Sequence, residues 1–285
     1  MKWTEPAYAK LNLTLDILGK LENGYHSLSM VMQSVSLCDQ VTLMRGEGIS
    51  GLQVACGNGA PSGPENIVWR AAQSFFDYCG IQDRDALFQI EKHIPSQAGM
   101  GGGSSDGAAA LRLLNRAYGT GLSPETLRQI GASVGADVPF CVTGGTMQAQ
   151  GIGEKLTPLA PLPDCTLLLC KPPVGVSTPQ AFRESDRAPA VPPKTPAMAA
   201  ALASGDLNQV AACLGNRFQE ILPLPEIEEI AAEMRFGGAL GACMTGSGSA
   251  VFGIFTEESA AQNTGEALRK WGQVWLARPV PQWEI

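Results

Sequence analysis

A glycine-dense segment, placed between an apolar run and a helix-like stretch, limits most strongly what this chain can fold into. It covers residues 94–103 and reads I-P-S-Q-A-G-M-G-G-G; the strand-like run 87–91 precedes it and a stretch rich in alanine and leucine, 104–117, follows it. Glycines permit the positive φ angles with which successive backbone N–H groups converge on one anion. A helix that starts directly after the loop adds its own unpaired N–H groups and the positive end of its dipole. This order of strand, loop and helix predicts a phosphate-binding loop.

The segment differs from the two commonest nucleotide-binding loops. No G-K-[ST] closes it, and the last glycine of G-x-G-x-x-G would fall on Ser104 or Asp106. The alternative is a flexible turn that happens to be rich in glycine. A second glycine loop, Thr245-Gly246-Ser247-Gly248-Ser249, lies between two strand-like runs and is equally compatible with an ordinary hairpin turn.

Strict alternation near the start of the chain predicts a β-strand. Leu11, Leu13, Leu15 and Ile17 alternate with Lys10, Asn12, Thr14 and Asp16. Such a period of two is typical of a half-buried strand that carries its polar residues on one face. Lys10 and Asn12 therefore share a face, and residue type alone leaves open whether Lys10 is a solvated lysine of an edge strand or a catalytic one.

Three further polar or aromatic residues stand at turns. Asp137 lies in the short loop Gly135-Ala136-Asp137-Val138-Pro139, where an aspartate either caps the turn or takes part in chemistry. Tyr25 and His26 directly follow the turn at residues 22–24. An aromatic ring beside a neutral imidazole could bind a flat heterocycle, although a position at the rim without a partner is the commoner outcome.

The order of helix-like and strand-like segments predicts an α+β protein with two lobes. Expected helices cover 65–78, 104–117, 123–135, 195–204, 207–213, 226–234 and 258–271, and expected strands cover 11–17, 30–35, 41–44, 52–55, 87–91, 166–170, 239–244, 250–256 and 274–277. A proline-rich stretch at 156–163 places the boundary near residue 155. We therefore expect one lobe over residues 1–155 and a second over residues 156–285.

Composition narrows the classes of function. The net charge of −7 argues against a general nucleic-acid surface, because phosphate backbones require a concentrated basic face. No uncharged apolar stretch is long enough to cross a membrane, and the first residues contain no apolar run typical of a signal peptide. The eight cysteines form no C-x-x-C pair and the two histidines have no metal-ligand spacing. These features favour a cytoplasmic protein without a structural metal, and they leave open a monomer or a homodimer.

Taken together, the motifs resemble those of the GHMP kinases. The matching motifs are Pro6-Ala7-Tyr8-Ala9-Lys10-Leu11-Asn12-Leu13, Gly24-Tyr25-His26, the loop 99–105, the Asp137 loop and Thr245-Gly246-Ser247-Gly248. These motifs span nearly the whole chain. The first, second and fourth motifs are similar to those of the GHMP kinase branch that acts on a cytidine diphosphate of methylerythritol. The resemblance implies Mg²⁺-dependent transfer of the ATP γ-phosphate to the 2-hydroxyl of that substrate, a step toward isoprenoid precursors. It also implies an N-terminal lobe like the second domain of ribosomal protein S5, a ferredoxin-like C-terminal lobe, and a cleft between them.

The resemblance also implies roles for individual residues. Asp137 would be the general base with Lys10 as its partner, Asn12 would orient the methylerythritol group, and Tyr25 and His26 would stack on and hydrogen-bond the cytosine. The residues expected to contact ATP are Pro95, Ser96, Gln97, Ala98, Gly99, Met100, Gly101, Gly102, Gly103, Ser104, Ser105, Asn66 on the adenine side, and Gly246 and Ser247 from the other lobe. Thr178 and Pro179 are expected to contact the substrate. Asp106 stands at a position where asparagine also occurs in this family. An acid there would face Mg²⁺ or point away from the phosphates.

Three alternatives remain at this stage. The first is another GHMP kinase, acting for example on homoserine or mevalonate, and the second is a decarboxylase of the same superfamily. Tyr25 and His26 argue against both, because neither has an obvious use for them. The third is a non-catalytic nucleotide-binding regulator on this fold, against which the presence of Lys10 and Asp137 argues.

Overall fold

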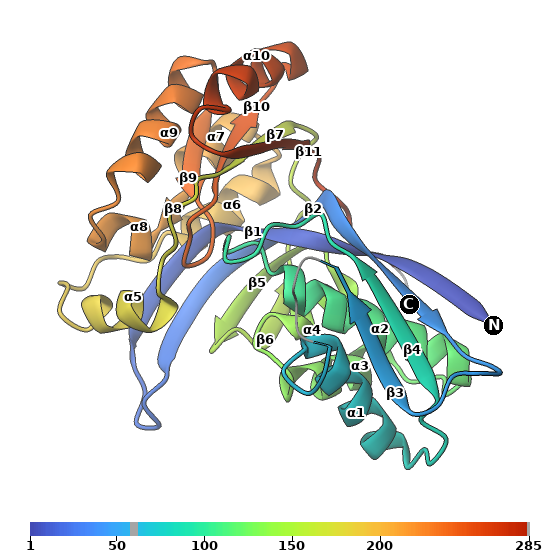
Figure 1. The fold of residues 1–285 in the computed structure, drawn as a ribbon. Coiled ribbons are helices and arrows are strands. Elements are labelled where there is room, and N and C mark those ends of the chain that lie inside the picture. The colour runs from blue at the N-terminus through green and yellow to red at the C-terminus, as the bar shows by residue number, and fades with distance from the viewer. Residues whose placement is uncertain (58–61, 284–285) are drawn as a thin grey trace.

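Two β-sheets, each covered by helices, build the molecule (Figure 1). The computed structural model describes residues 1–57 and 62–283. The first sheet contains β1 (Lys2–Lys20), β2 (His26–Met44), β3 (Leu52–Cys56), β4 (Ala86–Glu91), β5 (Thr146–Gly151), β6 (Lys155–Pro158) and β8 (Gly215–Asn216). The second contains β7 (Thr166–Lys171), β9 (Gly241–Met244), β10 (Val251–Phe255) and β11 (Gln273–Ala277), in the order β11-β7-β10-β9 and all antiparallel. The predicted two-lobed α+β fold is confirmed.

The helices divide between the two sheets. They are α1 (Ile67–Cys79), α2 (Gly102–Tyr118), α3 (Pro124–Ala132), α4 (Val138–Thr143), α5 (Thr178–Ser185), α6 (Thr195–Ser204), α7 (Leu207–Ala212), α8 (Arg217–Ile221), α9 (Pro225–Phe236) and α10 (Glu258–Leu268). The first four pack with the first sheet, and α9 and α10 cover the second. None of the helices in the described ranges is both long and apolar enough to cross a bilayer.

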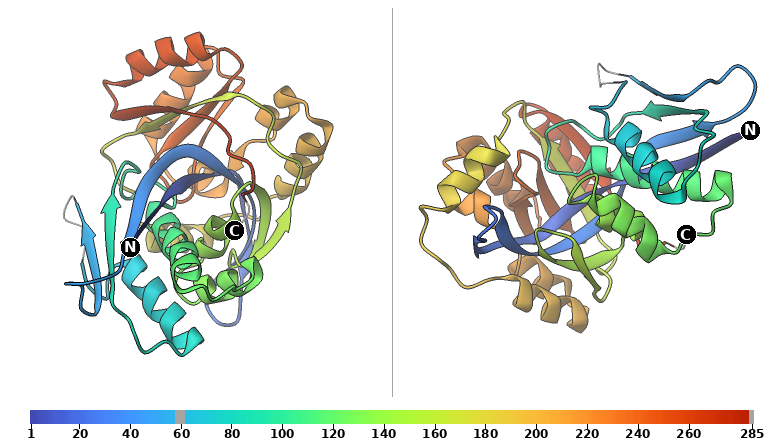
Figure 2. Two further views of the ribbon diagram at one scale, coloured as in Figure 1. Left: turned by 90° about the vertical axis from the view of Figure 1, so that its right-hand side faces the viewer. Right: turned by 90° about the horizontal axis from the view of Figure 1, so that it is seen from below.

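The long hairpin of β1 and β2 connects the lobes. Each strand has 19 residues, and three register shifts, at Tyr8/Ala9, Asn12/Thr14 and Ile17/Gly19, bend the pair. Figure 2 shows the resulting curved ribbon arching over the helices of the first lobe. The prediction of two separate strands at 30–35 and 41–44 was wrong, because β2 runs through both without interruption. Bulges let a long strand change direction while its pairing continues.

The expectation that β1 has a solvated polar face was also wrong. The strand lies inside the sheet, between β2 and the short parallel strand β8, and Lys10, Asn12 and Thr14 are no more than 4% exposed. Helix α2 packs on the strand, and the second lobe supplies partners such as Thr195, whose hydroxyl lies 2.8 Å from that of Thr14. The polar face of β1 therefore lines the junction of the lobes.

The chain passes between the two sheets more than once. β6 still pairs with β5 in the first sheet, β7 begins the second sheet, and β8 later returns to pair with β1. At the end of the chain, Val280 and Trp283 donate backbone N–H groups to Ser34 and Thr143 of the first lobe. A division at residue 155 remains a prediction.

Candidate active site

A cleft of about 650 Å³ gathers most of the polar residues predicted from the sequence. Its lining includes Lys10, Asn12, Tyr25, His26, Gly99, Gly101, Ser104, Asp137, Thr178, Pro179, Gly246 and Ser247. These residues come from six separate segments of both lobes. The fold therefore brings motifs that are up to about 240 residues apart in the chain to one place.

Lys10 and Asp137 form an ion pair in this cleft. The Lys10 Nζ lies 3.3 Å from Asp137 Oδ2, and it also donates a hydrogen bond of 2.6 Å to Asn12 Oδ1. The Asp137 side chain is 29% exposed and, although the residue precedes α4, it makes no capping hydrogen bond to that helix. Two non-catalytic interpretations are therefore wrong. Lys10 is not a solvated lysine of an edge strand, because it is buried, and Asp137 does not cap a turn, because its carboxylate faces the cleft.

The first glycine loop surrounds a small cavity of its own. Residues 94–103 and Lys92 line a space of about 150 Å³ next to the cleft. Gly101 has a φ of +69°, and a Cβ there would stand 3.0 Å from the Lys10 side chain. No side chain caps the N-terminus of α2, which begins at Gly102, two residues before the predicted start. Its first N–H groups remain available to an anion, as expected for a phosphate-binding loop.

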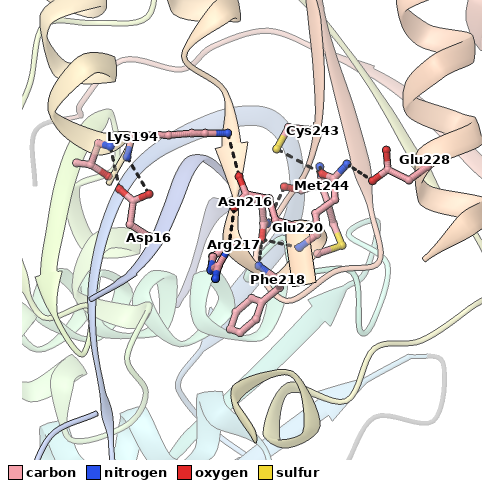
Figure 3. Close-up of polar contacts among 11 residues, drawn as sticks. Asp16, Lys194, Asn216, Arg217, Phe218, Glu220, Glu228, Cys243 and Met244 are labelled. Atoms are coloured by element: carbon pink, nitrogen blue, oxygen red, sulfur yellow. Dashed lines mark hydrogen bonds and ion pairs between the residues drawn. The ribbon is translucent and has the colours of Figure 1, made fainter. Parts of the chain in front are cut away.

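The second glycine loop is a turn between β9 and β10 that packs against the first loop. The Thr245 hydroxyl accepts a 3.0 Å hydrogen bond from the Asn12 N–H and donates one of 3.3 Å to the Gly99 carbonyl. Behind it, the buried Asn216 side chain donates a 2.8 Å hydrogen bond to the Met244 carbonyl (Figure 3) and another of 2.8 Å to the Gly246 carbonyl. The hairpin and the binding interpretations are thus compatible, because the same turn completes the wall of the cleft.

The side chains of several residues that were predicted to contact ATP do not point into the cleft. The Ser105 hydroxyl is buried and donates to the Tyr8 carbonyl, so it holds α2 to β1 and is turned away from the cleft. The side chains of Ala98 and Met100 are buried in the core between the lobes. Asn66 caps α1, where its side chain accepts a 2.8 Å hydrogen bond from the Val68 N–H. All residues from Pro95 to Gly103, including Ala98 and Met100, still line the loop cavity.

A buried charge network behind the loop was missed. Lys92, just before the loop, donates to both Asp39 and Asp106, and Asp39 also accepts the backbone N–H groups of His93 and Ile94. Asp106, in the first turns of α2, thus points away from the cleft and ties the end of the loop to its beginning. Burial holds the pKa of the Asp106 carboxyl well above its usual range, against the opposing effect of Lys92. The sequence showed the isolated charges but gave no sign of their pairing.

Aromatic residues at the far end of the cleft were missed as well. Phe182 on α5 stacks on His26, with ring centroids 4.6 Å apart and an interplanar angle of 19°, and Phe218 meets Phe182 edge-on at 5.0 Å. Tyr25, in contrast, is 61% exposed. Because α5 was not predicted, the signal that could have found Phe182 was its place one helical turn after Thr178, on the same side of a helix.

Comparisons with known proteins identify the class that this fold and site define. The profile of the GHMP kinases N terminal domain matches residues 66–145, and that of the GHMP kinases C terminal matches residues 198–274. A homoserine kinase structure from Cytophaga hutchinsonii has a TM-score of 0.76 at 17% identity, over 99% of this chain and 95% of that one, which shows a common fold. The chain is a small-molecule kinase of the GHMP type.

Relatives of higher identity define the family within this class. A 4-diphosphocytidyl-2-C-methyl-D-erythritol kinase from Pelotomaculum thermopropionicum is 43% identical over 94% of both chains, and one from Desulfitobacterium hafniense is 41% identical over 98% of this chain and 96% of its own. A crystal structure of 4-(cytidine 5'-diphospho)-2C-methyl-D-erythritol kinase matches 97% of this chain and 99% of its own, with a TM-score of 0.81 and 33% identity. The chain belongs to the 4-diphosphocytidyl-2-C-methyl-D-erythritol kinase family.

Proposed function

We propose that this protein transfers the γ-phosphate of ATP to the 2-hydroxyl of 4-diphosphocytidyl-2-C-methyl-D-erythritol, in the non-mevalonate synthesis of isoprenoid precursors. The observation that carries the proposal is the Lys10–Asp137 pair, which faces one cleft together with both glycine loops and the Tyr25–His26 motif. The family of the chain supports the same substrate.

Asp137 is the general base of the proposed reaction. An alcohol is a weak nucleophile, so a carboxylate within hydrogen-bond reach accepts its proton as the new bond between oxygen and the γ-phosphorus forms. The bond from the γ-phosphorus to the bridging oxygen breaks, and ADP leaves. Lys10, held by Asn12 and Asp137, stabilises the negative charge on the reacting oxygens. Most of the acceleration comes from positioning and charge, which suits a rigid strand that carries Lys10.

The glycine loops hold the triphosphate in this proposal. The uncapped start of α2 offers N–H groups from one side, and Gly246 and Ser247 line the cleft from the other. Among the described residues, no group of three or more His, Cys, Asp or Glu side chains could hold a metal ion by itself. In this proposal Mg²⁺ is bound mainly by ATP oxygens and water, as is usual for this ion. The bound ion would neutralise part of the phosphate charge.

The aromatic end of the cleft holds the cytosine. His26 and Phe182 form a stacked wall, and the exposed Tyr25 ring is free to cover a flat base from the solvent side. Thr178, whose hydroxyl lies 2.7 Å from that of Ser247, lies between this end and the phosphate region. The distribution of these groups along one cleft supports a substrate with a base at one end and a reactive hydroxyl at the other.

The proposal is tested by the appearance of product. Purified protein, ATP and Mg²⁺ are incubated with the cytidyl substrate, its uridine analogue, homoserine or mevalonate, and the products are followed by phosphorus NMR. We expect a new phosphomonoester signal with the cytidyl substrate. Turnover of homoserine or mevalonate in its place would overturn the proposed substrate while keeping the class of kinase.

A further inference from the structure

An acidic residue contacts His26 at the aromatic end of the cleft. Asp186 follows the last turn of α5, and its Oδ1 lies 2.6 Å from His26 Nε2, while its Oδ2 accepts a 3.0 Å hydrogen bond from Lys20. The three residues come from the two ends of the β1–β2 turn and from a helix about 160 residues later.

The contact fixes which imidazole nitrogen carries the proton. Hydrogen bonds from His26 and then from Lys20 hold the pKa of the Asp186 carboxyl below its usual range, so the group is a charged acceptor at neutral pH. The bond at 2.6 Å therefore places the hydrogen on Nε2. In the neutral ring, Nδ1 then carries a lone pair, and no hydrogen bond to it is found within residues 1–57 and 62–283.

The ring is also fixed in orientation. Phe182 stacks on one face, Phe218 supports Phe182, and the His26 side chain is only 9% exposed although it lines the cleft. A buried ring that is packed on one face and hydrogen-bonded at one edge cannot rotate without losing both contacts. His26 therefore presents an acceptor in a fixed direction.

We propose that Asp186 is a positioning residue that keeps His26 as a hydrogen-bond acceptor and thereby makes the cleft select cytosine over uracil. The inference rests on the proposed function. Cytosine carries an amino group at position 4, which donates to an acceptor, whereas uracil carries a carbonyl there, which does not. A site built to bond a donor discriminates strongly against a ligand that lacks it, because the buried acceptor is left unpaired.

Selectivity kinetics test the role of Asp186. The ratio of kcat/KM for the cytidyl substrate to that for its uridine analogue is measured in the wild type, in Asp186→Ala and in Asp186→Asn. We expect the ratio to fall by about tenfold or more in Asp186→Ala, through KM for the cytidyl substrate, with kcat at saturation and KM for ATP unchanged. Asp186→Asn keeps an acceptor oxygen in place and should retain more of the preference.

A matched control and an independent readout keep the test specific. Glu184→Ala removes another carboxylate of α5, which forms an ion pair with Arg187, and should leave the ratio unchanged. The protein has two histidines, so ¹⁵N spectra with His93→Gln for assignment report the tautomer of His26 directly. We expect the Nε2–H form in the wild type and its loss in Asp186→Ala.

The outcomes separate the two proposals. If the wild type phosphorylates neither nucleotide substrate, the proposed function fails. If the wild type prefers the cytidyl substrate and Asp186→Ala prefers it equally, or if alanine and asparagine lower the ratio equally, the positioning role of Asp186 fails alone.

Discussion

The backbones of Gly99 and Gly246 lie against each other where the two glycine loops meet. A Cβ on Gly246 would stand 2.7 Å from the Gly99 carbonyl oxygen, and a Cβ on Gly99 would stand 2.1 Å from the carbonyl oxygen of Thr245. Both glycines also have positive φ angles, of +58° and +74°. The two lobes thus meet in a contact that admits no side chain, so each loop sets the position of the other.

Replacement of Gly99 by alanine should therefore affect both folding and ATP binding. The substitution must separate the loops, and we expect a loss of more than about 2 kcal/mol in the free energy of unfolding and a rise of at least about tenfold in KM for ATP. Gly205→Ala is the matched control, because Gly205 has a φ of +70° but no atom within 4 Å of the added Cβ. It should cost about 1 kcal/mol and leave KM unchanged. Equal effects of the two variants would show that the contact between the loops is unimportant.

Asp137→Asn should remove the proposed base without removing the binding site. Asparagine has nearly the same shape but cannot accept the substrate proton, so kcat should fall by about 10² to 10⁴-fold. The Kd for ATP and for the cytidyl substrate, measured by calorimetry, should change little. Asp164→Asn, at a side chain that is 90% exposed, controls for the loss of a surface charge. Near-normal kcat in Asp137→Asn would exclude this residue as the base.

Local motifs explain why so much of the site was predictable. Lys10, Asn12, Asp137 and the glycine loops belong to short sequence patterns, and the fold brings these patterns to one cleft. The sequence left open how far each of these side chains is buried and what surrounds it. Lys10 was also compatible with a solvated edge strand until the structure showed that it is buried, with its backbone N–H bonded to the Met100 carbonyl and its side chain against Gly101.

The missed features depend on contacts between distant segments. Asp186 meets His26 only because α5 packs across the β1–β2 turn, and Lys92 meets Asp39 through the pairing of β4 with β2. Helix α4 was missed for a local reason, since V-P-F-C-V-T is rich in residues that favour strands. Neighbouring helices pack on it, and this tertiary packing overrides its weak propensity.

The buried Asp106 should make stability depend on pH. Its pKa is raised in the folded state, so the folded protein keeps a proton that the unfolded chain loses above about pH 4. Stability contributed by this group is therefore present at low pH and is lost as pH rises toward the folded-state pKa of about 8. Lys92 forms ion pairs with both Asp106 and Asp39 and so bridges the two carboxylates. Lys92 and Asp39 both remain in the Asp106→Asn variant.

Thermal unfolding across pH measures this effect. Because asparagine does not titrate, the Tm of Asp106→Asn relative to wild type should rise steadily between about pH 5 and about pH 8 and then level off. The difference between Asp164→Asn and wild type should stay flat over the same range. Parallel curves for Asp106→Asn and wild type would mean that Asp106 is ionised in the folded protein throughout.

Asn216 should prove more important for the second glycine loop than for the helix it caps. Its amide nitrogen donates to the carbonyls of Met244 and Gly246, and its oxygen accepts the N–H groups of Phe218 and Gln219 at the start of α8. Figure 3 shows Asn216 between Met244 and Phe218. Asn216→Asp keeps the acceptor for the helix but replaces the donor by an oxygen that faces two carbonyls. The cap survives, whereas the loop loses its anchor and two buried carbonyls lose their partner.

The two halves of this side chain can therefore be separated by experiment. We expect Asn216→Asp to lose about 2 to 3 kcal/mol in the free energy of unfolding and to raise KM for ATP, because Gly246 and Ser247 are released. Asn216→Ala removes the cap as well and should cost more. Asn208→Ala, at an exposed position of α7, should change neither quantity. If Asn216→Asp retained wild-type KM while Asn216→Ala did not, the helix cap, and not the anchoring of the loop, would be what this residue contributes to the site.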